Sequence, residues 1–138
     1  MLSAKCRYGI RAAAYLAREA HDGDYLPIRA ISNELGISFH FLTKILQDLS
    51  QCGLVASLRG PNGGVALARS ASEIFVSDVV EGIDGTDLWT GCILGLPNCG
   101  DETPCGLHAQ WAKERDRLFR LFSRTTLAQL AKDPTLRP

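Results

Sequence analysis

The sequence predicts a mostly α-helical chain that contains one small β-hairpin. Three observations support this class. Apolar residues recur at helical spacing over residues 4–51, two short β-prone segments flank a glycine-rich turn at residues 59–64, and a long helical pattern returns near residue 107. The chain has 138 residues, 46% hydrophobic and 22% charged, which is sufficient for one domain with a hydrophobic core.

Three helices are expected in the first part of the chain. The first covers residues 4–20 and is followed by a turn. Pro27 is well placed in the first turn of a second helix, which Gly36 ends. Ser38 caps a third helix that runs to about Gln51. The expected core positions of the third helix are Phe39, Leu42, Ile45, Leu46 and Leu49.

A β-hairpin is expected directly after the third helix. Residues 54–58 and 65–68 read as strands, and the Asn62-Gly63 pair in the turn between them favours positive φ. A short helix, a glycine turn and a longer helix form a helix-turn-helix, and a hairpin that follows it is a wing. The sequence therefore predicts a winged helix-turn-helix.

The second half of the chain is expected to be helical around one irregular segment. Helices are predicted at residues 74–83, 107–124 and 127–132, and the glycine- and proline-rich residues 86–108 have no regular pattern. An irregular segment of this length in a small domain usually has a function of its own. The apolar side of the long helix consists of Trp111, Leu118, Leu121 and Phe122.

The chain divides by charge and by pattern into two regions of one compact domain. Residues 1–75 form the winged helix-turn-helix region, with eight Lys and Arg against six Asp and Glu. Residues 76–138 form a second region with seven against nine, so any anion-binding surface is expected in the first. No apolar run is long enough to cross a membrane, and arginines interrupt the apolar stretches near the start. We therefore expect a cytoplasmic protein that does not bind a membrane.

The third helix has a polar face that is suited to DNA. In a helix-turn-helix, the N-terminal part of the second helix enters the major groove, where hydroxyls, an amide and a cation can bond to bases and phosphates. Phe41 can pack on a thymine methyl group or a sugar, or it can be half-buried under the wing. In the wing turn, Arg59 and Gly60 are expected to approach the minor groove. The expected contacts from the helix are Ser38, His40, Phe41, Thr43, Lys44 and Gln47.

Three of the five cysteines fall in the irregular segment, with the spacing Cys92-x6-Cys99-x5-Cys105-x2-His108. Thiolates and imidazole suit zinc or an iron–sulfur cluster, and gaps wider than the C-x2-C of zinc knuckles favour something larger than one ion. The alternatives are free thiols, a thiol–disulfide switch, and His108 as an ordinary polar residue of the helix. Cys6 and Cys52 lie in helical segments and are expected to be buried.

These motifs together resemble a known family. Residues 37–46, the Arg-Gly-x-x-Gly-Gly wing at residues 59–64 and the three-cysteine loop resemble the winged-helix iron–sulfur transcription regulators that include IscR and NsrR. The resemblance implies a homodimer with long, crossing C-terminal dimerisation helices, double-stranded DNA with a palindromic operator as partner, and Arg59 in the minor groove. It also implies a cluster held by Cys92, Cys99 and Cys105, with His108 at the position of the fourth ligand.

Two departures from the family pattern limit what the resemblance implies. The gap between Cys92 and Cys99 is one residue longer than in the usual IscR form, which leaves the cluster type open; [2Fe–2S] is favoured and [4Fe–4S] is possible. In NsrR-like members the fourth ligand can come from the partner's N-terminal helix, which leaves the role of His108 open. Thr43 stands where IscR-like members can have an acidic residue, so the DNA target sequence is also open.

We therefore expect a DNA-binding transcription regulator, and not an enzyme, that senses redox, iron or nitric oxide status through the cluster. One alternative is a cluster-free member of the same family that uses its cysteines as a thiol redox switch. A second is an iron–sulfur electron carrier, in which the wing would have no purpose.

Overall fold

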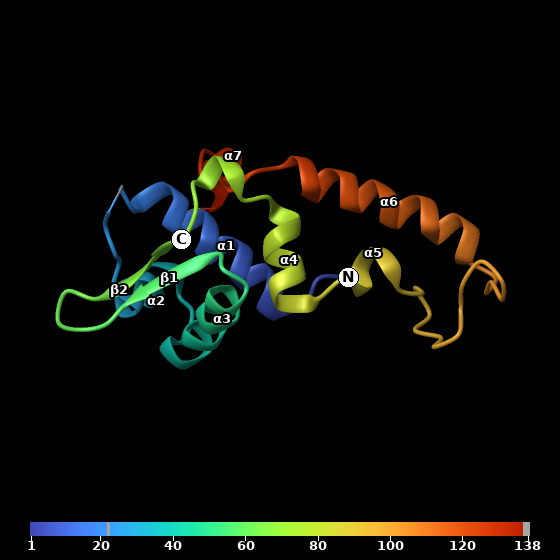
Figure 1. Cartoon of the computed structure of the whole chain (residues 1–138), viewed down its shortest axis with the longest axis horizontal. Helices are drawn as coiled ribbons and strands as arrows, with labels where there is room; N and C mark the ends of the chain where they lie inside the picture. Colours follow the sequence, from blue (N-terminus) through green and yellow to red (C-terminus); the bar gives the residue numbers. More distant parts are fainter. Residues whose placement is uncertain (22, 137–138) are drawn as a thin grey trace.

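The computed structural model describes residues 1–21 and 23–136, and it has a helical body from which a long helical arm projects (Figure 1). The arm consists of α5 (Asp87–Thr90), α6 (His108–Arg124) and the loop between them. Short 3-10 turns lie at Ala71–Glu73 and Pro134–Leu136. The body consists of α1 (Ala4–Glu19), α2 (Ile28–Leu35), α3 (Phe39–Gln51), β1 (Val55–Leu58), β2 (Gly64–Leu67), α4 (Val76–Asp84) and α7 (Leu127–Leu130).

The core of the body forms around α1. This helix has an alanine-rich buried face, and small side chains allow α3, α4 and α7 to pack closely against it. The core continues past residue 75, because Val79 of α4 and Leu127 of α7 are fully buried in the same cluster as Leu16 and Ile45. The two regions expected from the sequence therefore share one core; the last two residues of the second region, 137–138, lie outside the described residues.

The winged helix-turn-helix is confirmed in the body. Gly36 ends α2 in the left-handed conformation (φ 66°), and the Ser38 hydroxyl caps α3 by accepting the N–H of Phe41 at 3.2 Å. The strands β1 and β2 pair antiparallel. Leu26, just before α2, exchanges two backbone hydrogen bonds of 2.9 Å with Val65 of β2, which attaches the wing to the helix-turn-helix.

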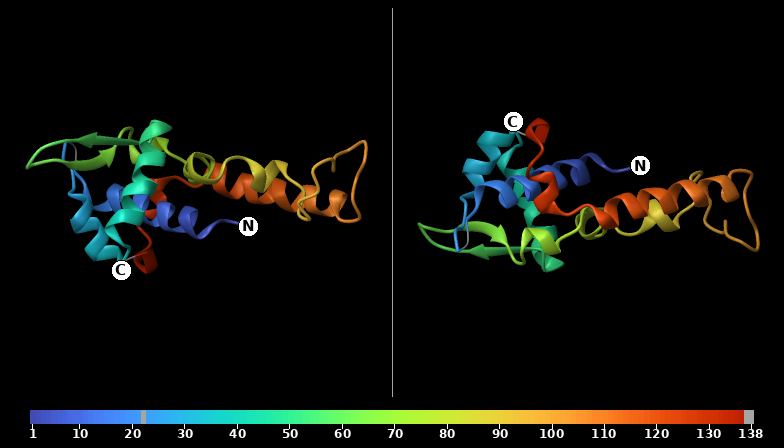
Figure 2. Two further views of the ribbon diagram at one scale, coloured as in Figure 1. Left: turned by 90° about the horizontal axis from the view of Figure 1, so that it is seen from below. Right: turned by 90° about the horizontal axis from the view of Figure 1, so that it is seen from above.

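The arm joins the body through an aromatic cluster. Trp89 of α5 packs against Phe119 and Phe122 of α6, with ring centroids 5.2 and 6.3 Å apart. The same cluster includes the fully buried Cys6 of α1 and Val80 of α4. From this joint α6 extends away from the body, with α5 alongside it and the residue 91–107 loop at its far end (Figure 2). The hairpin turn of the wing lies at the opposite end of the molecule.

Some helix boundaries in the second half of the chain differ from the expected ones, because backbone groups there bond to other segments instead of continuing the helix. The helix expected to start at residue 74 starts at Val76, because Ile74 accepts the N–H of Leu127 and the N–H of Phe75 bonds to the Asp78 carboxylate. The segment expected to be irregular contains the short helix α5. The last helix ends at Leu130, two residues earlier than expected. No helix among the described residues has the length and hydropathy of a bilayer span.

Two side chains expected in the core lie outside it. Phe39 is 40% exposed, because it is the first residue of α3 and its ring stacks with Arg29 rather than pointing inward. Cys52 is exposed, because α3 has ended and Cys52 is its C-cap. Cys6 is fully buried, as expected.

Candidate metal centre and nucleic-acid interface

The loop between α5 and α6 brings three thiols together. The sulfur atoms of Cys92, Cys99 and Cys105 all lie within 4.8 Å of one another, and those of Cys92 and Cys105 are 3.7 Å apart. All three side chains are half-buried. The first thiol follows α5 directly and the third lies just before α6, so the loop closes into a ring at the end of the arm.

An imidazole joins the three thiols. His108 is the first residue of α6, is 9% exposed, and has its Nδ1 3.4 Å from the Cys99 sulfur. Its Nε2 lies 2.9 Å from the carboxylate of Asp101, an arrangement that fixes ring orientation in metal sites. The backbone N–H of Cys105 donates to the Cys99 sulfur at 3.4 Å. The loop therefore supplies four soft or borderline donor atoms and orients two of them.

The local environment shifts the pKa values of two of the thiols in opposite directions. The pKa of Cys92 is lowered to about 7, chiefly because the backbone N–H of Leu96 donates to its sulfur, with help from the N–H of Leu94 and the other two thiols. The amide of Cys105 lowers the pKa of Cys99, but burial and the neighbouring thiols outweigh it, so this pKa lies above its ordinary value. Cys92 is therefore partly a thiolate near neutral pH, and the thiolate is the form that binds a metal or attacks a disulfide.

Two side chains of α6 hold the start of the loop. The indole N–H of Trp111 donates to the carbonyl of Gly91 at 2.9 Å, and the Arg115 guanidinium donates to the same carbonyl at 3.1 Å and to that of Thr90 at 3.3 Å. Gly91 immediately precedes Cys92. The position of the first thiol is therefore tied to the long helix.

The donor set fits a soft metal centre. Three thiols and one imidazole are typical ligands of iron–sulfur clusters, and the same set fits one tetrahedral zinc ion. The convergence of Cys92, Cys99 and Cys105 supports the metal site predicted from their spacing. The four ligand assignments themselves, and the nature of the metal, stay predictions.

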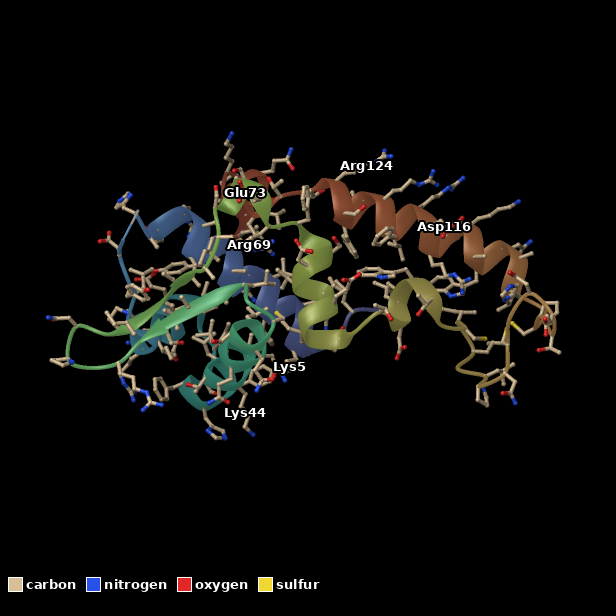
Figure 3. The ribbon with its side chains drawn as sticks, viewed as in Figure 1. Lys5, Lys44, Arg69, Glu73, Asp116 and Arg124 are labelled. Carbon is tan, nitrogen blue, oxygen red and sulfur yellow. The ribbon has the colours of Figure 1, made fainter. Side chains whose placement is uncertain are left out.

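The polar face of α3 is open to solvent. His40, Lys44 and Gln47 are exposed, and Lys44 points away from the body at the outer edge of the helix (Figure 3). Ser38 is exposed and its hydroxyl caps the helix, whereas the hydroxyl of the half-buried Thr43 donates to the carbonyl of Phe39 at 2.8 Å. These side chains extend from the N-cap of the helix to Gln47.

Phe41 and the wing complete this face. The Phe41 ring is half-buried, but it packs edge-to-face against Tyr8 of α1, at 5.8 Å, rather than beneath the wing. Arg59 and Gly60 are exposed in the wing turn, where Gly60 has φ 108°. Ile28, Thr43, Gln47 and Arg59 line one hollow between α3 and the wing. The roles of these residues in binding DNA stay predictions.

Three residues that position the cysteine loop have no sequence signal. Asp101 is seven positions from His108 in an irregular loop, and Trp111 and Arg115 lie twenty or more residues from the carbonyls that they hold. The helical spacing of apolar residues assigns Trp111 to the apolar side of the long helix but does not show that its N–H holds the loop. Only the folded arm brings these groups together.

Comparison with known proteins gives a consistent family assignment. The Rrf2 profile, described as "Iron-dependent Transcriptional regulator", matches residues 2–133. The HTH-type transcriptional regulators IscR of Xenorhabdus nematophila and Cronobacter sakazakii are 33% and 34% identical to this chain over 132 residues. That alignment covers 96% of this chain and 79% and 80% of those proteins.

Solved structures show the same fold. CymR, the global cysteine regulator of B. subtilis, has a TM-score of 0.76 and 28% identity, with 95% of each chain covered. T. potens IscR has a TM-score of 0.76 and 27% identity, with 96% of this chain and 87% of that chain covered. The oxidized form of Staphylococcus aureus CymR has a TM-score of 0.76 and 26% identity, with 96% and 97% covered.

Proposed function

This chain belongs to the Rrf2 family and is an IscR-like transcriptional regulator, and from that premise we propose that an iron–sulfur cluster sets its affinity for DNA. The cluster would be held by Cys92, Cys99, Cys105 and His108. The observation that carries the proposal is the convergence of the three thiols within 4.8 Å, with the His108 imidazole beside them. When bound, the cluster supplies a redox-active iron centre that oxidants and nitric oxide can alter.

The DNA-binding face is proposed to be the surface formed by α3 and the wing. The N-terminal half of α3 enters the major groove, and Arg59 enters the adjacent minor groove. The bases are read by side chains of the N-cap and of α3, namely the exposed Ser38, His40, Lys44 and Gln47 and the half-buried Thr43. Phe41 contributes mainly by holding α3 against Tyr8 of α1.

The arm is proposed to pair two copies of the chain. Phe119 is 39% exposed and Leu121 is 58% exposed on α6, and apolar residues of this size are unfavourable in water on a projecting helix. Phe119 already packs against Trp89, and burial of Leu121 against the partner's α6 gives a homodimer. A two-fold dimer presents two copies of α3, so we expect a roughly palindromic operator with its half-sites about one DNA turn apart.

The chain also has a physical connection between the cysteine loop and the body. Trp111 and Arg115 fix the carbonyls next to Cys92, and Trp89, three residues before Cys92, packs against α6 and the joint with α1 and α4. A change in the loop therefore shifts α5 and α6 relative to the body. In a dimer that shift changes the distance or tilt between the two α3 helices, and with it the DNA affinity. The regulator relatives give no reason to assign catalysis, and we propose none.

A second candidate has its own supporting observation. Cys92 and Cys105 have sulfur atoms 3.7 Å apart, which is near enough for a disulfide after a small movement, and an oxidized form of S. aureus CymR has the same fold. In this thiol switch, the two thiols lose two protons and two electrons to a peroxide, which is reduced to water. The chain would then regulate DNA binding without a metal.

Metal analysis of anaerobically purified protein tests the proposal. We expect iron and acid-labile sulfide in the wild type, loss of both in Cys99→Ala, and full retention in the control Cys52→Ala, whose thiol is exposed and outside the loop. Circular dichroism should show a folded chain in both variants. If the wild type contains only zinc, or if Cys99→Ala keeps its iron and sulfide, the proposed cluster site is wrong. A peroxide-dependent change in DNA affinity that needs Cys92 and Cys105 but no iron would establish the second candidate.

A further inference from the structure

Phe39 and Arg29 form a pair that neither the core nor the DNA face described above accounts for. Phe39 is the first residue of α3 and is 40% exposed. The guanidinium of Arg29, in the first turn of α2, lies over its ring at 4.5 Å from the centroid. A cation–π contact of this kind limits the orientations of a long side chain that is otherwise free in solvent. The pair therefore presents a guanidinium in a fixed position at the surface.

The Arg29 guanidinium differs from most of the other stacked and paired arginines. Arg11 lies over the Tyr8 ring at 5.5 Å without an ion pair among the described residues, but Arg11 is half-buried, whereas Arg29 is exposed. Arg18 also lies over an aromatic ring, but it donates to Glu19, and Arg115 donates to backbone carbonyls. Arg69 and Arg117 lie within salt-bridge distance of acidic side chains. Within residues 1–21 and 23–136, Arg29 has neither an acidic partner nor a hydrogen bond. Its planar set of N–H donors, which suits a phosphate, faces solvent.

The pair also lies where DNA is expected to pass. In a helix-turn-helix the second helix enters the major groove, and the first helix crosses the sugar–phosphate backbone beside it. Arg29 is on the first of these helices and touches the first residue of the second. Its neighbour Ile28 lines the hollow between α3 and the wing, together with Thr43 and Arg59. The pair is therefore at the edge of the proposed interface and not on a remote surface.

We propose that Arg29, seated on Phe39, is a phosphate-binding subsite for the DNA strand that borders the groove entered by α3. This inference rests on the proposed DNA-binding function and assigns it a backbone contact. Such a contact positions the protein but reads no bases, so it strengthens binding to every sequence equally. Phe39 acts as the platform that holds the guanidinium and not as a DNA contact in its own right.

Fluorescence anisotropy over a range of salt concentrations tests the subsite. The probes are a duplex selected from a random library by the wild-type dimer and a scrambled duplex of the same composition. Arg29→Ala should weaken binding to both duplexes by the same factor, roughly tenfold at low salt. The slope of log affinity against log salt should fall by roughly 0.9 for each lost contact, or about 1.8 for a dimer. The control Arg124→Ala also removes one positive charge, but at the end of α6, at the opposite edge of the molecule from Lys44 of α3 (Figure 3), and its slope should stay at the wild-type value.

A double-mutant cycle tests the platform. Phe39→Leu keeps an apolar side chain at the start of α3 but removes the ring, and it should weaken binding about threefold when Arg29 is present. The same change in the Arg29→Ala background should not weaken DNA binding further, because no guanidinium is then present for the Phe39 ring to hold. Circular dichroism and iron content should be unchanged in all three variants.

The possible failures are distinguishable. If the wild type and Arg59→Ala show that the chain binds the selected duplex through the wing, but Arg29→Ala keeps the wild-type salt slope, only the subsite is wrong. If Arg29→Ala weakens the selected duplex alone, Arg29 reads bases, and the phosphate assignment is overturned. If the wild type binds neither duplex, the proposed DNA-binding function itself fails.

Discussion

Arg59 is the residue on which the wing's proposed contact with DNA depends. It lies in an exposed turn, has no ion pair among the described residues, and is followed by Gly60, whose small size lets the backbone approach a duplex. We predict that Arg59→Ala weakens binding to the selected duplex by about 1–3 kcal/mol, measured by anisotropy at fixed salt. The iron content should stay at the wild-type value, because the wing and the cysteine loop lie at opposite ends of the folded molecule (Figure 1).

Arg59→Lys is the matched control for this prediction. It keeps the charge but not the planar donors, so it should recover only part of the affinity. Unchanged affinity in Arg59→Ala would show that the wing does not contact DNA, even if the rest of the interface is correct.

The cysteines show at the residue scale what the sequence could and could not predict. Spacing alone identified Cys92, Cys99 and Cys105 as one group, because all three lie in a single short loop whose ends are joined by the fold. Cys52 was expected to be buried because it lies in a helical segment, but α3 ends at Gln51 and Cys52 is its exposed C-cap. Burial raises the pKa of Cys6 to about 12, with Asp84 as a further cause, so its thiol is inert at neutral pH.

At the element scale, the wing depends on a close approach between β2 and the segment before α2. A Cβ on Gly64 would lie 2.1 Å from the backbone carbonyl oxygen of Leu26, and that backbone cannot move without breaking the two hydrogen bonds between Leu26 and Val65. We predict that Gly64→Ala lowers the free energy of unfolding by about 1–3 kcal/mol, measured by urea denaturation.

Gly100→Ala provides the control for Gly64→Ala. A Cβ on Gly100 has no neighbour within 4 Å, and the residue does not have a positive φ. The free energy of unfolding of Gly100→Ala should therefore be within about 0.5 kcal/mol of the wild-type value, as for most surface substitutions. Equal stability of the two variants would mean that the wing is not packed against the helix-turn-helix as described.

The elements of the body were predictable, and those at the joint were less so. Helical spacing and turn residues identified α1, α2, α3 and the hairpin because each carries its own local signal. The start of α4 depends on the pairing of Phe75 with Thr126, a partner some fifty residues away, which no local pattern contains. The helix α5 is stabilised by the packing of Trp89 on α6, and the loop hydrogen bonds of Trp111 and Arg115 likewise depend on the folded arm.

At the scale of the whole molecule, the arm is expected to contact a partner surface. The cysteine loop and α3 are far apart within one chain, so the loop can affect DNA binding only if the arm acts on the body or on a second copy (Figures 1 and 2). Leu121, 58% exposed on α6, is placed to lie in such an interface. We predict that Leu121→Glu converts the dimer into a monomer in sedimentation-velocity experiments, because a buried, unpaired carboxylate is costly.

The monomer should also bind the selected duplex at least about tenfold more weakly, because it loses the second half-site. Arg120→Glu, which is exposed on the same helix and points about 100° away from Leu121 around the helix axis, is the control and should stay dimeric. A Leu121→Glu protein that remains a dimer would place the interface elsewhere.

The central claim is that occupancy of the cysteine loop sets DNA affinity. The most direct measurement is the affinity of one preparation for the selected duplex, taken anaerobically as metal-free protein, after cluster reconstitution, and again after oxidation. Regulatory couplings of this kind are about 1–3 kcal/mol, so the metal-free and reconstituted states should differ by roughly 5–150-fold. The same treatments applied to Cys99→Ala should leave its affinity constant. Identical affinity of the wild type in all three states would contradict the claim.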